Sequence, residues 1–166
     1  MSRKARKAKR RDPQAAPPPR LNAAQAALAR RLQARGTNVT LRVNPPGVEK
    51  MSEVLLQFAE PILDRSAPLE EIRSTLFFAM TLWNYALLPA KARSESKGLF
   101  RKVLSDPWSS SVVQGLLERK AQLFADNQRM FYDLEVDQRG DELKVNVVSA
   151  LPGSPAAGGA KKLGSL

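Results

Sequence analysis

LEEIRSTLFFAMTLWNYALL, residues 69–88, is the stretch from which the rest of the fold can be worked out. Glu70 and Glu71 stand in its first turn, where negative charge favours a helix start, and Pro89 follows its end. Its second half is apolar on nearly every side, which is typical of a helix buried at the centre of a domain. We therefore expect a central helix that contributes Phe77 and Trp83 to the core.

Helical periodicity continues on both sides of this segment. Residues 48–64 place apolar side chains at three- and four-residue spacing, and Pro61 should kink or end that helix. Residues 90–105 read as a shorter basic amphipathic helix. Asp106 and Pro107 form a typical helix start, and the helix they open should run to about residue 130.

Beyond residue 130 the apolar period changes from helical to alternating. Residues 131–137 (FYDLEVD) and 142–149 (ELKVNVVS) flank the turn sequence QRGD at 138–141. This pattern predicts a β-hairpin. Because a lone hairpin is marginally stable, it must pack on the helices or pair with another strand. Residues 37–43 (TNVTLRV) are the candidate third strand.

Residues 22–35 (NAAQAALARRLQAR) predict a further, basic helix. Asn22 can cap its start, alanine favours it throughout, and Gly36 follows as a stop. Its apolar side is thin, with Leu28 and Leu32 as its largest members within the helix. We expect such a face to dock weakly.

Together these patterns predict an α+β fold: a small, mostly helical domain of three to four helices with a C-terminal β-hairpin. Residues 1–20 should form a disordered basic, Pro-rich arm, because clustered bases repel one another and no large apolar side chain is available to bury. Residues 21–47 should hold the basic helix and a short strand, residues 48–149 the helical body with its hairpin, and residues 150–166 a flexible tail.

The net charge of +11 lies entirely in the first 48 residues. That segment carries twelve Lys or Arg against one acid, whereas residues 49–166 carry fifteen of each. A basic arm on a neutral body is typical of binding to an anionic partner, RNA or DNA first and an anionic membrane surface second. The membrane is less favoured because no large apolar residue lies among the bases of the arm. The candidate phosphate-binding residues are Arg3, Lys4, Arg6, Lys7, Lys9, Arg10, Arg11, Arg30, Arg31, Arg35 and Arg42. The alternatives are a solubilising or localising tail and, for the last four, an ordinary solvated helix face.

The chain contains no histidine and no cysteine. These absences exclude disulfides, thiolate metal sites, Cys nucleophiles and Ser-His-Asp triads. Glu49, Glu53 and Glu60 lie close to one helical face, but the Glu-x-x-His motif of di-iron bundles is missing. We expect no catalytic residue, no metal and no cofactor, while carboxylate-, Ser- or Lys-based chemistry stays open.

Trp83, Asn84 and Tyr85 form a polar interruption in the most apolar helix. A buried Asn must satisfy its amide, so these residues could line a ligand pocket. The alternative is a core Trp and Tyr, with Asn84 bonded to a neighbouring backbone segment.

The function that these features predict is a non-enzymatic accessory or regulatory protein that binds nucleic acid through its arm and a protein partner through its body. Two alternatives stay open: a pure protein-interaction adaptor, and a small enzyme or ligand-binding domain with a pocket near Trp83 and Asn84. No signal peptide is visible, and the most apolar run, residues 75–88, is shorter than the ~20 residues that a membrane span needs. We therefore expect no transmembrane segment and a cytoplasmic location, with nucleoid, ribosomal or eukaryotic nuclear association as variants of it.

Overall fold

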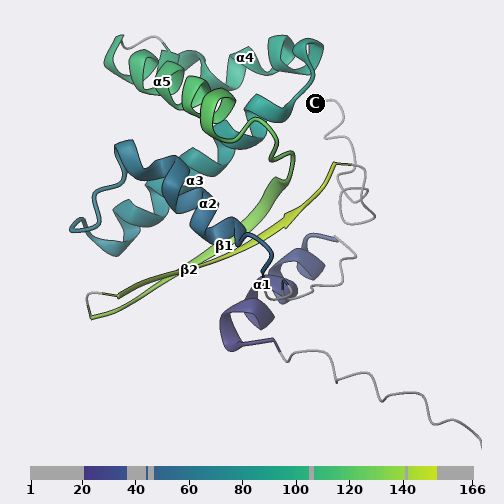
Figure 1. Cartoon of the computed structure of the whole chain (residues 1–166), viewed down its shortest axis with the longest axis vertical. Coiled ribbons are helices and arrows are strands. Elements are labelled where there is room, and N and C mark those ends of the chain that lie inside the picture. Colours follow the sequence, from purple (N-terminus) through teal and green to yellow (C-terminus); the bar gives the residue numbers. More distant parts are fainter. Residues whose placement is uncertain (1–20, 37–43, 45–46, 105–106, 141, 153–166) are drawn as a thin grey trace, which may run out of the picture.

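The computed structural model of the chain describes residues 21–36, 44, 47–104, 107–140 and 142–152 (Figure 1). The elements follow the order α1 (Ala23–Ala34), α2 (Met51–Ala59), the short 3-10 helix η1 (Glu60–Ile62), α3 (Leu69–Leu87), α4 (Ala90–Leu104), α5 (Pro107–Leu123), β1 (Met130–Arg139) and β2 (Glu142–Ala150). The predicted α+β class is confirmed, since five α-helices and an antiparallel hairpin make up the described part of the chain. The predicted arm, the tail from residue 153 onward and the candidate strand at 37–43 lie outside the described residues.

The helix that the sequence predicts over residues 48–64 is divided at its C-terminal end. In an α-helix the carbonyl of Gln57 would accept from the backbone N–H of residue 61, but Pro61 has none. The chain changes to the tighter η1 helix at this point. The guanidinium of Arg119 in α5 supplies the missing donor, because its Nη2 lies 2.9 Å from the Gln57 carbonyl and 3.0 Å from Glu60. One side chain therefore joins α5 to the end of α2.

Helix α5 ends at Leu123, earlier than the residue 130 that the apolar pattern suggested. The side chain of Lys120 explains this end. Its Nζ donates to the carbonyl of Phe124 at 2.6 Å and to that of Asn127 at 3.1 Å. These carbonyls follow the last turn, so the ammonium stabilises the chain as it leaves the helix.

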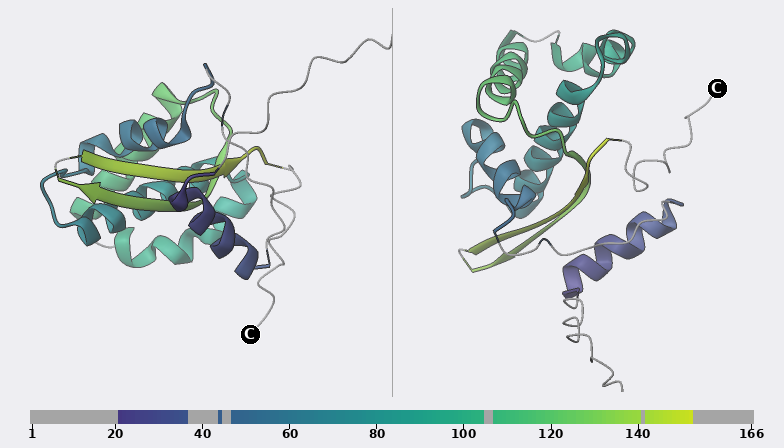
Figure 2. Two further views of the ribbon diagram at one scale, coloured as in Figure 1. Left: turned by 90° about the horizontal axis from the view of Figure 1, so that it is seen from below. Right: turned by 45° about the vertical axis from the view of Figure 1, so that its right-hand side comes forward.

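The hairpin separates the molecule into two unequal parts. Helices α2–α5 lie to one side of β1 and β2, with α2 and α3 packed directly on the strands, whereas α1 lies on the other side (Figure 2). Leu134 pairs with Val147 and Val136 with Val145, and all four contribute to the core shared with the helices. Gly140 adopts φ +60° in the turn, a conformation that favours glycine. The inner face of the hairpin is thus apolar and closed by the helical body.

The centre of the core is aromatic. Trp83 is fully buried, and its ring centroid lies 5.3 Å from that of Phe58 and 5.4 Å from those of Phe124 and Phe131. The prediction for Phe77 is wrong, because its side chain is 37% exposed. Phe77 lies on α3 in line with Ser74 and Thr81, which are also exposed, so the helix has a solvent-facing stripe after all.

Candidate nucleic-acid interface

Helix α1 and its C-cap residue Arg35 carry the described part of the predicted phosphate-binding set. Its start is fixed by a capping box in which the Asn22 side chain accepts from the Gln25 backbone at 2.8 Å and the Gln25 side chain accepts from the Asn22 backbone at 2.9 Å. Gly36 follows its end with φ +75°. The helix packs on β1 and β2 and buries Leu28 and Leu32. The thin apolar side expected from the sequence is therefore in contact with the hairpin.

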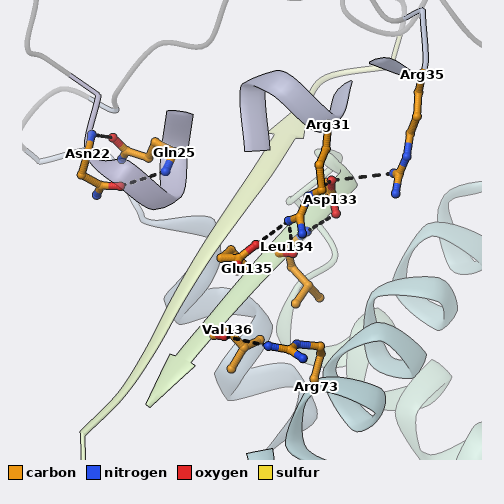
Figure 3. A network of polar contacts seen from close by, with 9 residues as sticks. All are labelled: Asn22, Gln25, Arg31, Arg35, Arg73, Asp133, Leu134, Glu135 and Val136. Carbon is orange, nitrogen blue, oxygen red and sulfur yellow. Dashed lines mark hydrogen bonds and ion pairs between the residues drawn. The ribbon is translucent and has the colours of Figure 1, made fainter. Parts of the chain in front are cut away.

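Arg31 anchors α1 to the outer face of β1 (Figure 3). Its Nε lies 3.2 Å from Asp133 Oδ2, and its Nη2 lies 2.7 Å from Glu135 Oε2. The same Nη2 donates to the Leu134 carbonyl at 2.9 Å. One guanidinium thus contacts three successive residues of the strand, and ion pairs add to the small apolar contact.

Asp133 is the buried partner in this arrangement, with 1% of its side chain exposed. Its Oδ1 accepts from the Leu134 backbone N–H at 2.9 Å. No donor among the described residues forms a well-aligned hydrogen bond to its Oδ2. That oxygen faces two guanidinium groups instead, since Arg35 Nη1 lies 3.7 Å away in addition to Arg31. A buried carboxylate needs such paired cations, so Asp133 depends on the two arginines for as long as it is buried.

The candidate residues fall into three groups. Arg31 and Arg35 are paired with acids of the same chain. Arg30 is exposed and forms no ion pair with another described residue. The remaining eight lie outside the described residues: Arg3, Lys4, Arg6, Lys7, Lys9, Arg10, Arg11 and Arg42.

Sequence reasoning missed the acidic partners of α1. The signal was present in two places. Alternation along FYDLEVD puts Asp133 and Glu135 on the face of the strand opposite Leu134 and Val136, and Arg31 and Arg35 stand one helical turn apart. Nothing local joins the two patterns, because about a hundred residues separate them.

The alternative ligand site around Trp83 and Asn84 is built into the fold instead. Trp83 Nε1 donates to the Arg129 carbonyl at 2.8 Å. Asn84 Nδ2 donates to the Phe131 carbonyl at 2.7 Å, and its Oδ1 accepts from the Phe131 N–H at 2.9 Å. Tyr85 is partly buried, and its hydroxyl donates to the Arg93 carbonyl at 3.4 Å. The polar atoms of Trp83 and Asn84 are thus engaged with the protein backbone.

Asn84, Arg31 and Arg73 all donate hydrogen bonds to backbone carbonyls at the open edge of β1. In an antiparallel pair only alternate residues exchange backbone hydrogen bonds with the partner strand, and the groups in between face outward. Asn84 bonds Phe131, Arg31 bonds Leu134, and Arg73 Nη2 donates to the Val136 carbonyl at 3.3 Å. Side chains from α1 and α3 therefore occupy backbone groups that would otherwise be open to another strand.

The described residues contain no group of three or more His, Cys, Asp and Glu residues arranged to hold a metal ion. None of the helices in the described part of the chain is long and apolar enough to span a membrane.

Comparison with known proteins gives no relative from which a role could be transferred. No protein-family model, curated protein or solved structure matches this chain.

Proposed function

We propose that this protein is a non-enzymatic accessory or regulatory protein that binds RNA or DNA through its basic N-terminal segment, while its body contacts a protein partner. The observation that carries the proposal is the charge partition. Twelve bases against one acid precede residue 49, and bases and acids balance after it. Such a field favours a phosphate backbone, whose binding is driven by counterion release.

The contacts of α1 indicate that the bases of the arm, and not those of α1, supply most of the charge for nucleic-acid binding. Arg31 and Arg35 are paired with Asp133, so part of the basic charge of residues 21–36 is used to hold α1 on the hairpin. The arm residues 3–11 then supply most of the charge left for an external anion. Because no aromatic residue lies among these bases, they have nothing to stack on nucleotides, and we expect little sequence preference.

The experiment compares the salt dependence of nucleic-acid binding with and without residues 2–11, which hold the basic cluster of the arm. Binding of the full chain to single-stranded RNA and DNA should weaken with salt, with a log–log slope of about −0.7 per neutralised phosphate. Deletion of residues 2–11 removes seven bases. If four to seven of them engage at once, the slope should become shallower by about 3–5.

The control is a full-length variant with the same seven bases replaced by Gln, which keeps the length of the arm. It should behave as the deletion does, and both should melt at the temperature of the parent protein. An unchanged salt slope would contradict the proposal and favour the solubilising or localising tail.

A further inference from the structure

The contact between α1 and the hairpin occupies the two arginines that would otherwise extend the basic arm. Arg31 is shared by Asp133 and Glu135, and Arg35 lies near Asp133. Both arginines also keep substantial exposure, with 43% and 59% of their side chains accessible. They are thus held by the protein while still being within reach of an external anion.

This contact is also incompletely satisfied. Asp133 Oδ2 and Asn146 Nδ2 are the two buried side-chain atoms, among those described, that have no hydrogen-bond partner. Asn146 stands opposite Glu135 in the register, so it lies on the same face of the hairpin as Asp133 and Glu135. Asp133 Oδ2 is thus held by ion pairs without a well-aligned hydrogen bond, and Asn146 Nδ2 has no hydrogen-bond partner among the described residues. Buried polar groups that lack good hydrogen bonds weaken the contact between α1 and the hairpin.

The apolar contact between α1 and the hairpin is small, and it is separate from the main core. Leu28 and Leu32 are the buried residues of α1, and neither belongs to the core cluster that the helices α2, α3 and α5 share with the hairpin. Removal of α1 would therefore leave the main core closed. It would also return Asp133 to water, where a carboxylate is stable without a partner.

We infer that α1 is a releasable latch: docked, it holds Arg31 and Arg35 on the acidic face of the hairpin, and a nucleic-acid backbone competes with Asp133 and Glu135 for both arginines. Nη2 of Arg31 already contacts the Leu134 carbonyl and the Glu135 carboxylate, so it must leave one of them to donate to a phosphate. Binding and release are consequently linked, and each favours the other by the same factor. This inference rests on the proposed function and names its regulation.

The test uses Glu135→Gln in the full chain, with Glu118→Gln as the matched control. Glu118 is exposed on α5 and accepts from Gln114 rather than from an arginine, so both variants change the net charge equally. The probe is oligo(dT). Loss of one partly exposed ion pair from the docked state should tighten binding by Glu135→Gln about two- to fivefold. Glu118→Gln should bind as the parent protein does.

The salt slope gives a second measurement on the same samples. If weakening the docked state lets one or two further arginines engage phosphates, the slope for Glu135→Gln should steepen by about 0.7–1.4 relative to Glu118→Gln. Equal affinities and equal slopes for the two variants would overturn the latch.

Amide hydrogen exchange measures the release of α1 from the hairpin directly. Saturating the parent protein with oligo(dT) should accelerate exchange in α1 (Ala23–Ala34) while α3 (Leu69–Leu87) stays protected. Unchanged or slower exchange in α1, in a protein that binds through residues 2–11, would overturn the latch and leave the proposed function standing. Failure of the parent and of Glu135→Gln to bind at low salt would overturn both.

Discussion

Asn84 shows how a single side chain can take the place of a neighbouring strand. Its carboxamide carries both a donor and an acceptor, and here Nδ2 donates to the carbonyl of Phe131 while Oδ1 accepts from the N–H of the same residue. The sequence indicated that a buried Asn needs partners, but it could not say which backbone segment would supply them. That information depends on how α3 packs against β1.

Substitution of Asn84 by Ala should lower the free energy of unfolding by about 1–3 kcal/mol, because the N–H and C=O of Phe131 lose their partner beside the core. Chemical denaturation measures the change. Gln114→Ala is the control, since Gln114 is exposed and pairs with Glu118 on the surface of α5. It should stay within about 0.5 kcal/mol of the parent. Loss of nucleic-acid binding by Asn84→Ala at unchanged stability would show that Asn84 belongs to a ligand site instead.

Lys120 is a second residue whose role depends on distant neighbours. Its side chain is buried, and Nζ lies 4.4 Å from the ring centroid of Trp83. Burial lowers the pKa of Lys120 from its ordinary value of 10.5. The unfolded chain therefore binds this proton more tightly than the native protein does.

Lys120→Met should be about 1–3 kcal/mol less stable at neutral pH, because the carbonyls of Phe124 and Asn127 lose their donor. The sign of the pH dependence follows from the lowered pKa. As pH rises through the native pKa toward 10.5, the contribution of Lys120 to stability increases, and above 10.5 it is constant. The difference between parent and variant should grow over that interval. Lys91→Met is the control for the loss of an exposed lysine, and it should stay within about 0.5 kcal/mol of the parent protein at neutral pH.

At the scale of the elements, most of what the sequence predicts lies in helix starts, helix periods and the hairpin. The start of α1 at Asn22, the break at Pro61 and the two strands all follow from local chemistry. The C-terminal end of α5 does not. Apolar residues continue beyond Leu123 because the next segment enters the core through Phe124, so the pattern alone cannot mark the end of the helix.

The contact between α5 and the C-terminal end of α2 allows the explanation for that helix end to be tested. Arg119→Ala should destabilise the protein by about 1 kcal/mol, since Gln57 then loses a charged donor. Pro61→Ala restores a backbone N–H that can reach Gln57 if η1 reverts to an α-helical turn. Arg119→Ala should consequently have a smaller effect in the Pro61→Ala background. A double-mutant cycle measured by denaturation gives this coupling, and strictly additive effects would contradict the explanation.

At the scale of the whole molecule, the apolar pattern does not determine where α1 docks, and charge complementarity with β1 does. The basic α1 lies on the face of β1 that carries Asp133 and Glu135 (Figure 3), while α2 and α3 pack on the apolar face. The sequence predicted the basic segment and the hairpin separately. Their contact includes ion pairs between residues about a hundred positions apart, and no local pattern in the sequence encodes which cation meets which carboxylate.

The position of the core is the other global property, and two aromatic residues of α3 test it. Trp83 is fully buried among Phe58, Phe124 and Phe131, whereas Phe77 is 37% exposed. Trp83→Ala should therefore leave a cavity that lowers the unfolding free energy by about 3–5 kcal/mol, and Phe77→Ala should change it by about 0.5 kcal/mol or less.

Thermal unfolding of the two variants distinguishes this arrangement from a helix that is buried on all sides. A loss of 3–5 kcal/mol is a large share of the roughly 5–15 kcal/mol that stabilises a domain, and it should lower Tm by more than about 10 °C. Phe77→Ala serves as the matched control because it truncates an aromatic residue of the same helix. If both variants melted at the same temperature, the aromatic cluster around Trp83 would not be the centre of the core. A large loss for Phe77→Ala alone would place the core on the opposite face of α3, away from the hairpin.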